Sequence, residues 1–145
     1  MKPPYRCSVP IQVRFRDTDA MGHVNNAVYA SYIEVARTAY WCDLFDLASY
    51  NQVDFVLARL EIDFVAPLFV QDQLEVWLRI NRLGTRSFRM AYEFVRQPGD
   101  ETIARAESVQ VMYDYTTGTS KPLSPEQRRR ILAFEDPTTV ETHDS

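Results

Sequence analysis

The stretch VRFRDTDAMGHVNNAVYASYIEVAR, residues 13–37, joins the end of a strand pattern to the start of a long helix pattern through a polar loop. Ahead of the loop, apolar side chains alternate with polar ones from Val9 to Phe15, which predicts a half-buried strand over residues 9–15. After the loop, Asn25 and Asn26 are good helix N-cap residues, and apolar residues follow at spacings of three and four as far as Leu47. The segment therefore predicts a strand, a loop over residues 17–24 and a helix of several turns.

The predicted helix carries apolar side chains around most of its circumference. Beside the first apolar row runs a second one, formed by Val28, Tyr32, Val35 and Ala39. Only a narrow polar stripe remains, formed by Ser31, Glu34, Arg37 and Thr38. Such a helix must be covered by other elements, because an apolar surface of that width is unfavourable in water.

The rest of the chain is mostly strand-like and predicts the covering layer. Strand patterns run over residues 55–65, 74–80, 88–94 and 103–113, and turn residues such as Pro67, Gly84 and the sequence QPGD at 97–100 separate them. Consecutive strands with short turns favour an antiparallel meander. Small residues at Ala104, Ala106 and Ser108 would let the helix lie close to the sheet. The expected fold class is α+β, with an antiparallel sheet wrapped around one long central helix.

The C-terminal part of the chain predicts a short helix and a tail. Ser124, Pro125 and Glu126 suit the start of a closing helix over residues 124–134. The acidic, Thr-rich residues 135–145 are expected to be frayed and flexible. The domain prediction is a single unit over residues 1–145, with an ordered part from about 8 to 134.

Length, composition and charge exclude several classes of function. A chain of 145 residues favours a single domain. The net charge of −4 argues against a general nucleic-acid binder, and the three arginines at 128–130 are interpreted as complementing the dipole of the closing helix in its last turns. No stretch is apolar enough to cross a membrane, and two isolated cysteines without an N-terminal secretory pattern indicate a cytoplasmic protein. The two histidines lack partners at zinc spacing, so neither a metal site nor a cofactor is expected.

The loop before the helix gathers the side chains that suggest chemistry. Asp17, Asp19, His23, Asn25 and Asn26 converge on a helix N-terminus. One interpretation is purely structural: the aspartates form Asx turns, an asparagine caps the helix and the imidazole packs on the loop. The other is catalytic, because N–H groups at a helix start can hold a developing oxyanion while a carboxylate attacks a carbonyl or activates water. Patterns of serine hydrolases, NTPases and dinucleotide-binding enzymes are absent from the sequence.

The stretch at 13–37 resembles the signature of the 4-hydroxybenzoyl-CoA thioesterase-like branch of the hotdog-fold acyl-CoA thioesterases. The stretches VLARLEIDFVAPLFVQDQLEV and RLGTRSFRMAYEF are similar to the strands that follow in this family, so the resemblance covers roughly residues 8–125. It implies a hotdog fold, two subunits that pair edge to edge, active sites at the subunit interface, and assembly as a dimer or tetramer.

The resemblance also assigns roles to residues of the loop. Asp19, the second acid of the D-x-D pair, falls at the catalytic position, where it acts as nucleophile or general base, and Asp17 is structural. The implied oxyanion contact is the backbone N–H at Asn26, and His23 and Asn25 complete the set of candidate catalytic residues. Some bacterial members carry tyrosine and histidine where this chain has Phe15 and Asn26, so their variant of the mechanism does not transfer.

A second segment is similar to the part of the family that lies near bound CoA. It consists of Gly84, Thr85, Arg86 and Ser87, and Arg59 is expected in a strand next to it. A hairpin turn with solvated arginines is the alternative interpretation. The predicted function is an acyl-CoA thioesterase that releases a carboxylic acid and CoA. The alternatives are a thioesterase acting on acyl carrier protein and a non-catalytic protein that binds acyl-CoA or acyl chains.

Overall fold

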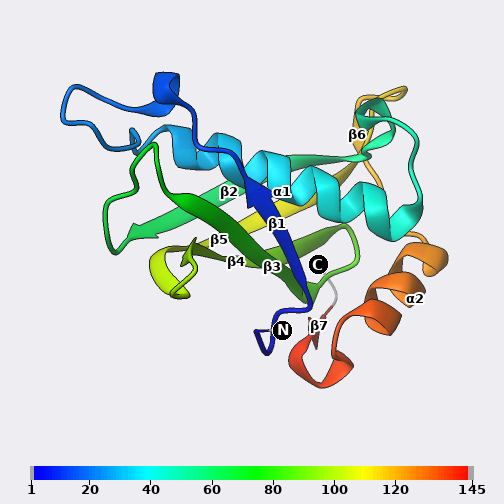
Figure 1. The fold of residues 1–145 in the computed structure, drawn as a ribbon. Helices are drawn as coiled ribbons and strands as arrows, with labels where there is room; N and C mark the ends of the chain where they lie inside the picture. The colour runs from blue at the N-terminus through cyan, green and yellow to red at the C-terminus, as the bar shows by residue number, and fades with distance from the viewer. Residues whose placement is uncertain (1, 144–145) are drawn as a thin grey trace.

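The computed structural model describes residues 2–143 and contains one curled sheet with a long helix across it (Figure 1). The strands are β1 (Cys7–Ile11), β2 (Phe55–Phe64), β3 (Gln73–Leu83), β4 (Ser87–Gln97), β5 (Glu101–Asp114), β6 (Thr119–Ser120) and β7 (Glu141–Thr142). The helices are α1 (Val28–Phe45) and α2 (Pro125–Phe134), with 3-10 turns at Phe15–Asp17, Tyr50–Gln52 and Pro137–Thr139. The α+β fold predicted from the sequence is confirmed.

The sheet has the strand order β1-β3-β4-β5-β2. β3, β4 and β5 form the predicted antiparallel meander, and Asp100 closes the β4–β5 hairpin with a φ of 52°. β2 does not pair with β3, its successor in the chain, but lies at the far edge beside β5. That edge is long, and Leu57 and Phe64 on it are exposed.

α1 lies across one face of the sheet, as its apolar pattern predicts (Figure 1). Its buried side includes Tyr29, Ile33 and Trp41, and the Trp41 ring stacks on Phe88 of β4 at a centroid distance of 4.9 Å. The second apolar row of the helix is not covered along its whole length as expected, because Val35 is 55% exposed. Neither the sheet nor α2 covers that side of the helix.

The first strand begins and ends earlier than its alternating pattern suggests. β1 stops at Ile11, and Phe15 lies in a 3-10 turn with 81% of its surface exposed. The cause is local, because the backbone N–H of Asp17 donates to the Arg14 carbonyl at 2.9 Å and turns the chain. Apolar alternation therefore continues past the point where the hydrogen bonds of the strand end.

α2 begins as predicted, with Ser124 accepting a hydrogen bond from the backbone N–H of Gln127. The arginines at 128–130 lie in the middle of the helix and not in its last turns. Arg129 and Arg130 both pair with Glu126, which leaves no uniform basic patch on this helix.

The segment after α2 packs against the domain within residues 135–143 instead of fraying from it. Glu135 is buried, and its carboxylate accepts hydrogen bonds from the Tyr40 hydroxyl at 2.6 Å and the Ile80 backbone at 2.8 Å. β7 pairs in parallel with the end of β3, and Val140 is buried. Residues 144–145 of the expected tail lie outside the described residues. No helix in the described part of the chain is long and apolar enough to span a membrane.

Candidate functional site

The loop in front of α1 is closed by its own backbone. The Asp19 N–H donates to the His23 carbonyl at 2.8 Å, and the Gly22 N–H donates to the Asp19 carbonyl at 3.1 Å. Gly22 has a φ of 88°, a region that glycine enters at little cost. Asp19 and His23 therefore face each other across a tight turn.

A second loop fixes this turn to the sheet. The Val24 N–H donates to the Leu68 carbonyl at 2.7 Å, and His23 forms an isolated β-bridge with Phe69. The His23 and Phe69 rings meet edge to face at 6.2 Å. The loop before α1 and the loop between β2 and β3 lie at the same end of the helix (Figure 1).

Asp17 is the buried anchor of the loop. Its side chain is 3% exposed and accepts hydrogen bonds from the Tyr32 hydroxyl at 2.5 Å and from the Arg14 guanidinium at 3.0 Å. Burial alone would raise the pKa of Asp17, but the hydrogen bonds from Arg14 and Tyr32 outweigh it and lower the pKa. Burial together with the bond to Asp17 raises the pKa of the Tyr32 phenol. The burial and the hydrogen bonds of Asp17 fit the structural role expected for it.

Asp19 has a different environment, although it is only two residues away. Its side chain is 33% exposed, and one carboxylate oxygen lies 3.3 Å from Nδ1 of His23, whose side chain is 36% exposed. The other oxygen accepts a hydrogen bond from the Met21 N–H at 2.9 Å. This is the Asx turn of the structural interpretation, yet it leaves the carboxylate open to solvent and beside an imidazole.

Asn25 and Asn26 form the turn that starts α1. The Asn25 side chain accepts a hydrogen bond from the Ala27 N–H at 2.9 Å, and its carbonyl accepts one from Val28. Ala27 occupies the N-cap position, so neither asparagine is the side-chain cap that the sequence suggested. Within residues 2–143, the backbone N–H of Asn26 has no hydrogen-bond partner. Asn26 is an exposed residue and directly precedes the N-cap residue at the positive end of the 18-residue helix α1.

The segment predicted to lie near CoA forms the turn between β3 and β4. Arg128 donates to the Gly84 carbonyl at 2.6 Å, Leu123 donates to the Thr85 carbonyl at 2.9 Å, and the Gly84 N–H donates to the Ser87 carbonyl at 2.7 Å. Arg86 is exposed and bonds Ser120 at 3.3 Å.

The expected adjacency of Arg59 to this turn is wrong, because β5 separates β2 from β4. Arg59 is exposed on the edge strand and pairs with Glu61. The chain reaches the far edge of the sheet after α1, a crossover that the order of strands in the sequence does not reveal.

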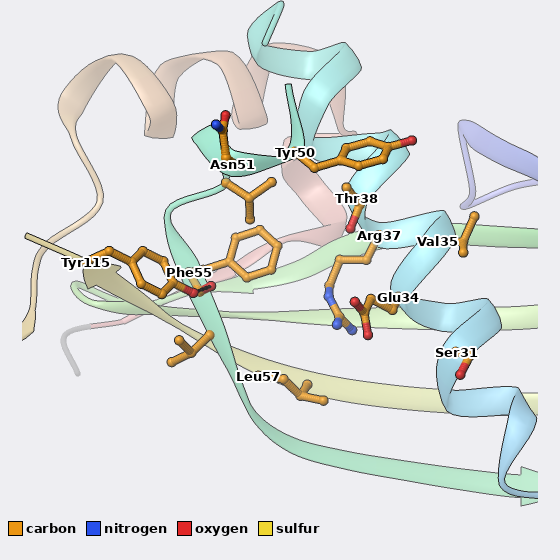
Figure 2. Close-up of a pocket in the computed structure, with 12 residues that line it drawn as sticks. Ser31, Glu34, Val35, Arg37, Thr38, Tyr50, Asn51, Phe55, Leu57 and Tyr115 are labelled. Carbon is orange, nitrogen blue, oxygen red and sulfur yellow. Dashed lines mark hydrogen bonds between the residues drawn. The ribbon is translucent and has the colours of Figure 1, made fainter. Parts of the chain in front are cut away.

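One feature that sequence reasoning missed is a cavity of about 870 Å³ between α1 and the start of β2 (Figure 2). Arg37 of α1 lines it, although the sequence pattern places this residue in the polar stripe of the helix. Asp19 is not among the residues that line this cavity. The arginine is 5% exposed, so its charge is buried beside an open space. Only the strand order, which brings β2 opposite this face of α1, could have revealed it.

The described residues contain no cluster of three or more histidine, cysteine or acidic side chains placed to hold a metal ion. The candidate site consists of one partly exposed carboxylate, one imidazole and a helix-start amide without a partner among these residues, while the cavity lies along α1 and is lined by other residues.

A family model of the thioesterase-like superfamily matches residues 13–131. The chain belongs to this superfamily. The match begins ahead of the loop that carries Asp19 and ends within α2, so it includes both the candidate site and most of the sheet.

Individual members of the superfamily align over most of their length. A 1,4-dihydroxy-2-naphthoyl-CoA hydrolase of Rippkaea orientalis is 30% identical over 86% of this chain and 94% of its own length. The long-chain acyl-CoA thioesterase FadM of Escherichia coli is 26% identical over 83% of this chain and 93% of its own. The crystal structure of a thioesterase complexed with coenzyme A and Zn from Thermus thermophilus superimposes with a TM-score of 0.82 and 36% identity, covering 92% of this chain and 98% of that one.

Replacing Asp17 by Asn should destabilise the fold by about 2–3 kcal/mol at pH 7, because charge-assisted hydrogen bonds to a buried carboxylate are lost. The lowered pKa of Asp17 sets the pH dependence: its contribution is complete above the ordinary value of 3.8 and disappears as the pH falls through the lowered folded value. Urea unfolding at pH 7 and at pH 3 measures this difference, with the exposed Asp43→Asn as the control. Equal stability of the Asp17→Asn variant and the parent at pH 7 would contradict the anchoring role.

Proposed function

We propose that this chain hydrolyses acyl-CoA thioesters to a carboxylic acid and CoA, with Asp19 as its catalytic carboxylate. The observation that carries the proposal is the presence of a partly exposed carboxylate and an unbonded helix-start amide in one loop that is closed by its own backbone hydrogen bonds. Membership of the thioesterase-like superfamily supports the reaction class, and the names of relatives include a naphthoyl-CoA hydrolase and a long-chain acyl-CoA thioesterase.

The reaction needs few groups, since a thiolate leaves without the general acid that an amide leaving group requires. As a general base, Asp19 takes a proton from water while the water oxygen attacks the thioester carbonyl carbon. The C–S bond of the tetrahedral intermediate then breaks, and the CoA thiolate takes up the proton. As a nucleophile, Asp19 instead attacks the carbonyl carbon and the C–S bond breaks, which releases the CoA thiolate and leaves a mixed anhydride. Water then hydrolyses the anhydride to the carboxylic acid and the free Asp19 carboxylate, and the thiolate takes up the remaining proton. Both routes consume one water and require neither a metal nor a cofactor.

The Asn26 N–H would polarise the carbonyl. It has no protein partner in the described structure and stands at the positive end of α1. A preorganised backbone donor of this kind stabilises the oxyanion that forms in the transition state. Any side chain at position 26 could present that amide, which is why the absence of histidine here is compatible with activity.

His23 would position the carboxylate, and Asn25 would hold the turn that carries the amide. The imidazole contacts Asp19 at 3.3 Å and is itself held against Phe69. A carboxylate with one oxygen bonded by Met21 and the other beside an imidazole has few accessible orientations. The assignment of the 84–87 turn with Arg86 to bound CoA, and of the chain to the 4-hydroxybenzoyl-CoA branch, stays a prediction, whereas Arg59 lies apart from that turn.

We also propose that two copies complete the site by pairing along β2. This edge strand of ten residues is unpaired on one side and exposes apolar side chains such as Leu57. An exposed edge of that length and character is a template for another strand. Val35 and Phe15, exposed on α1 and beside the loop, would be covered by the same association.

Replacing Asp19 by Asn should lower kcat by about 10²–10⁴-fold, the usual effect of losing a general base, and should leave the melting temperature unchanged. Hydrolysis of a panel of aryl, short-chain and long-chain acyl-CoA esters and acyl carrier protein conjugates provides the measurement, with Asp43→Asn, exposed on α1 and outside both the loop and β2, as the matched control. Near-full activity of the Asp19→Asn variant would overturn the assignment. Hydrolysis of carrier-protein conjugates alone, or of no ester, would favour one of the two alternative functions.

Replacing His23 by Ala should lower kcat by roughly tenfold through a less ordered carboxylate, since misplacement of a reacting group is costly. The loss should be absent in the Asp19→Asn background, because the two residues act through the same group. An equal loss in both backgrounds would instead assign His23 to packing of the loop.

The protein in solution should have a mass of at least two chains in sedimentation equilibrium. A Leu57→Lys variant should shift the mass toward the single chain, since it places a charge on the proposed contact edge. Circular dichroism shows whether that variant keeps its fold. A monomeric parent protein with full thioesterase activity would contradict completion of the site by a second copy.

A further inference from the structure

The guanidinium of Arg37 is buried without a counterion. Its side chain is 5% exposed, and it forms no ion pair with any carboxylate of residues 2–143. Its Nε is buried and has no hydrogen-bond partner. A buried charge left unpaired costs several kcal/mol, whereas an anion beside it recovers much of that cost.

The two groups that hold the Arg37 guanidinium are neutral. One Nη lies 3.4 Å from the Tyr92 hydroxyl, which in turn bonds the Ser108 hydroxyl at 2.6 Å. The guanidinium carbon lies 5.9 Å from the centre of the Phe55 ring. A hydroxyl and an aromatic face orient the guanidinium, but neither one neutralises it.

The same arginine lines the cavity between α1 and β2. Figure 2 shows its guanidinium extending from α1 toward β2. Apolar side chains such as Phe55 and Leu57 form the opposite wall. Glu34 also lines the cavity but is exposed and forms no ion pair with Arg37 among the described residues. The cavity thus combines an apolar wall with one buried cationic group.

The cavity extends along α1 from near the helix start. Ser31, in the first turn, and Thr38, two turns later, both line it. Arg37 is eleven positions after Asn26 in the chain, or about 16 Å along a helix axis. Arginine side chains on a helix lean toward its N-terminus, which shortens that gap. An extended chain of eight to ten bonds, at about 1.2 Å per bond, spans a distance of this order.

From these observations we infer that the site takes an acyl group whose far end carries a carboxylate, bound by Arg37. This inference rests on the proposed function, because it assigns the far end of the same substrate. The preferred substrate class is then the CoA monothioester of a medium-chain dicarboxylic acid. Arg37 binds the substrate and takes no part in breaking the thioester bond.

The test compares suberyl-CoA, the monothioester of octanedioic acid, with octanoyl-CoA, which differs only in the terminal group. The parent protein should prefer suberyl-CoA by roughly 30-fold in kcat/KM, the effect of a desolvated charge contact. Arg37→Met should abolish this preference and Arg37→Lys should keep part of it, while the exposed Arg129→Met should not change it. A ratio measured within one variant does not depend on the fraction of folded enzyme.

Glu34→Gln should have the opposite effect to Arg37→Met. Glu34 carries the same negative charge as the substrate carboxylate, so its removal from the cavity wall should raise the preference for suberyl-CoA by a few-fold. A fall in the preference would contradict the repulsion that the inference requires between Glu34 and a bound substrate carboxylate, and it would overturn the inference. An octanoyl-CoA preference in the parent protein, or an unchanged ratio in Arg37→Met, would overturn it as well, as expected if a carboxylate of a second copy occupies the cavity.

A binding measurement separates this inference from the proposed function. Calorimetry with free octanedioate and octanoate requires no turnover, and only octanedioate should bind, with the affinity lost in Arg37→Met. If no thioester is hydrolysed but this selective binding remains, the proposed function fails and the anion site stands. If thioesters are hydrolysed and octanedioate does not bind selectively, the anion site fails alone.

Discussion

The hydrogen bonds on the buried Asp17 carboxylate are the constraint on which the loop before α1 depends. They join three parts of the chain: Arg14 after the first strand, Asp17 itself and Tyr32 on α1. A charge can be kept in this position only because donors on both sides offset its desolvation. The chain must therefore turn sharply after Arg14, which ends the strand pattern early and leaves Phe15 exposed.

From this anchor the geometry of the candidate site follows. Two residues after Asp17 the chain turns outward, so Asp19 is presented to solvent while its neighbour is buried. The Asn25 N–H then returns to the Asp17 carbonyl at 2.9 Å, which places the free amide of Asn26 at the start of α1. The two acids of the D-x-D pattern thus have different environments, since Asp17 is buried and bonded to Arg14 and Tyr32 while Asp19 is partly exposed.

Most of the fold could be predicted from the sequence, because it depends on local periodicity. The meander, the length of α1 and the start of α2 at Ser124 follow from patterns within a few residues of one another. The position of β2 at the sheet edge could not be predicted, since it depends on a crossover that carries no local signal. That position decides which residues are neighbours, which explains both the wrong placement of Arg59 beside the 84–87 turn and the unexpected burial of Arg37.

The C-terminal segment illustrates the same limit. Residues 135–143 have the composition of a polar tail, yet the Glu135 carboxylate is buried against Tyr40 and the backbone of β3. Burial raises the pKa of Glu135 even though these hydrogen bonds oppose the shift. The composition of a segment indicates how much apolar surface that segment can bury. It does not reveal that Tyr40 and the backbone N–H of Ile80, both distant in the sequence, donate hydrogen bonds to the buried carboxylate. Within the loop, by contrast, the candidate residues could be identified because they are close in sequence.

The most direct measurement of the central claim is a crystal structure with an acyl-CoA analogue in which a methylene group replaces the thioester sulfur and the carbonyl is kept. The account predicts that the carbonyl oxygen lies within about 3.2 Å of the Asn26 backbone nitrogen, a hydrogen-bond distance. The Asp19 carboxylate should then face the carbonyl carbon directly or through one water. A carbonyl bound away from both groups in the assembled protein would contradict the account.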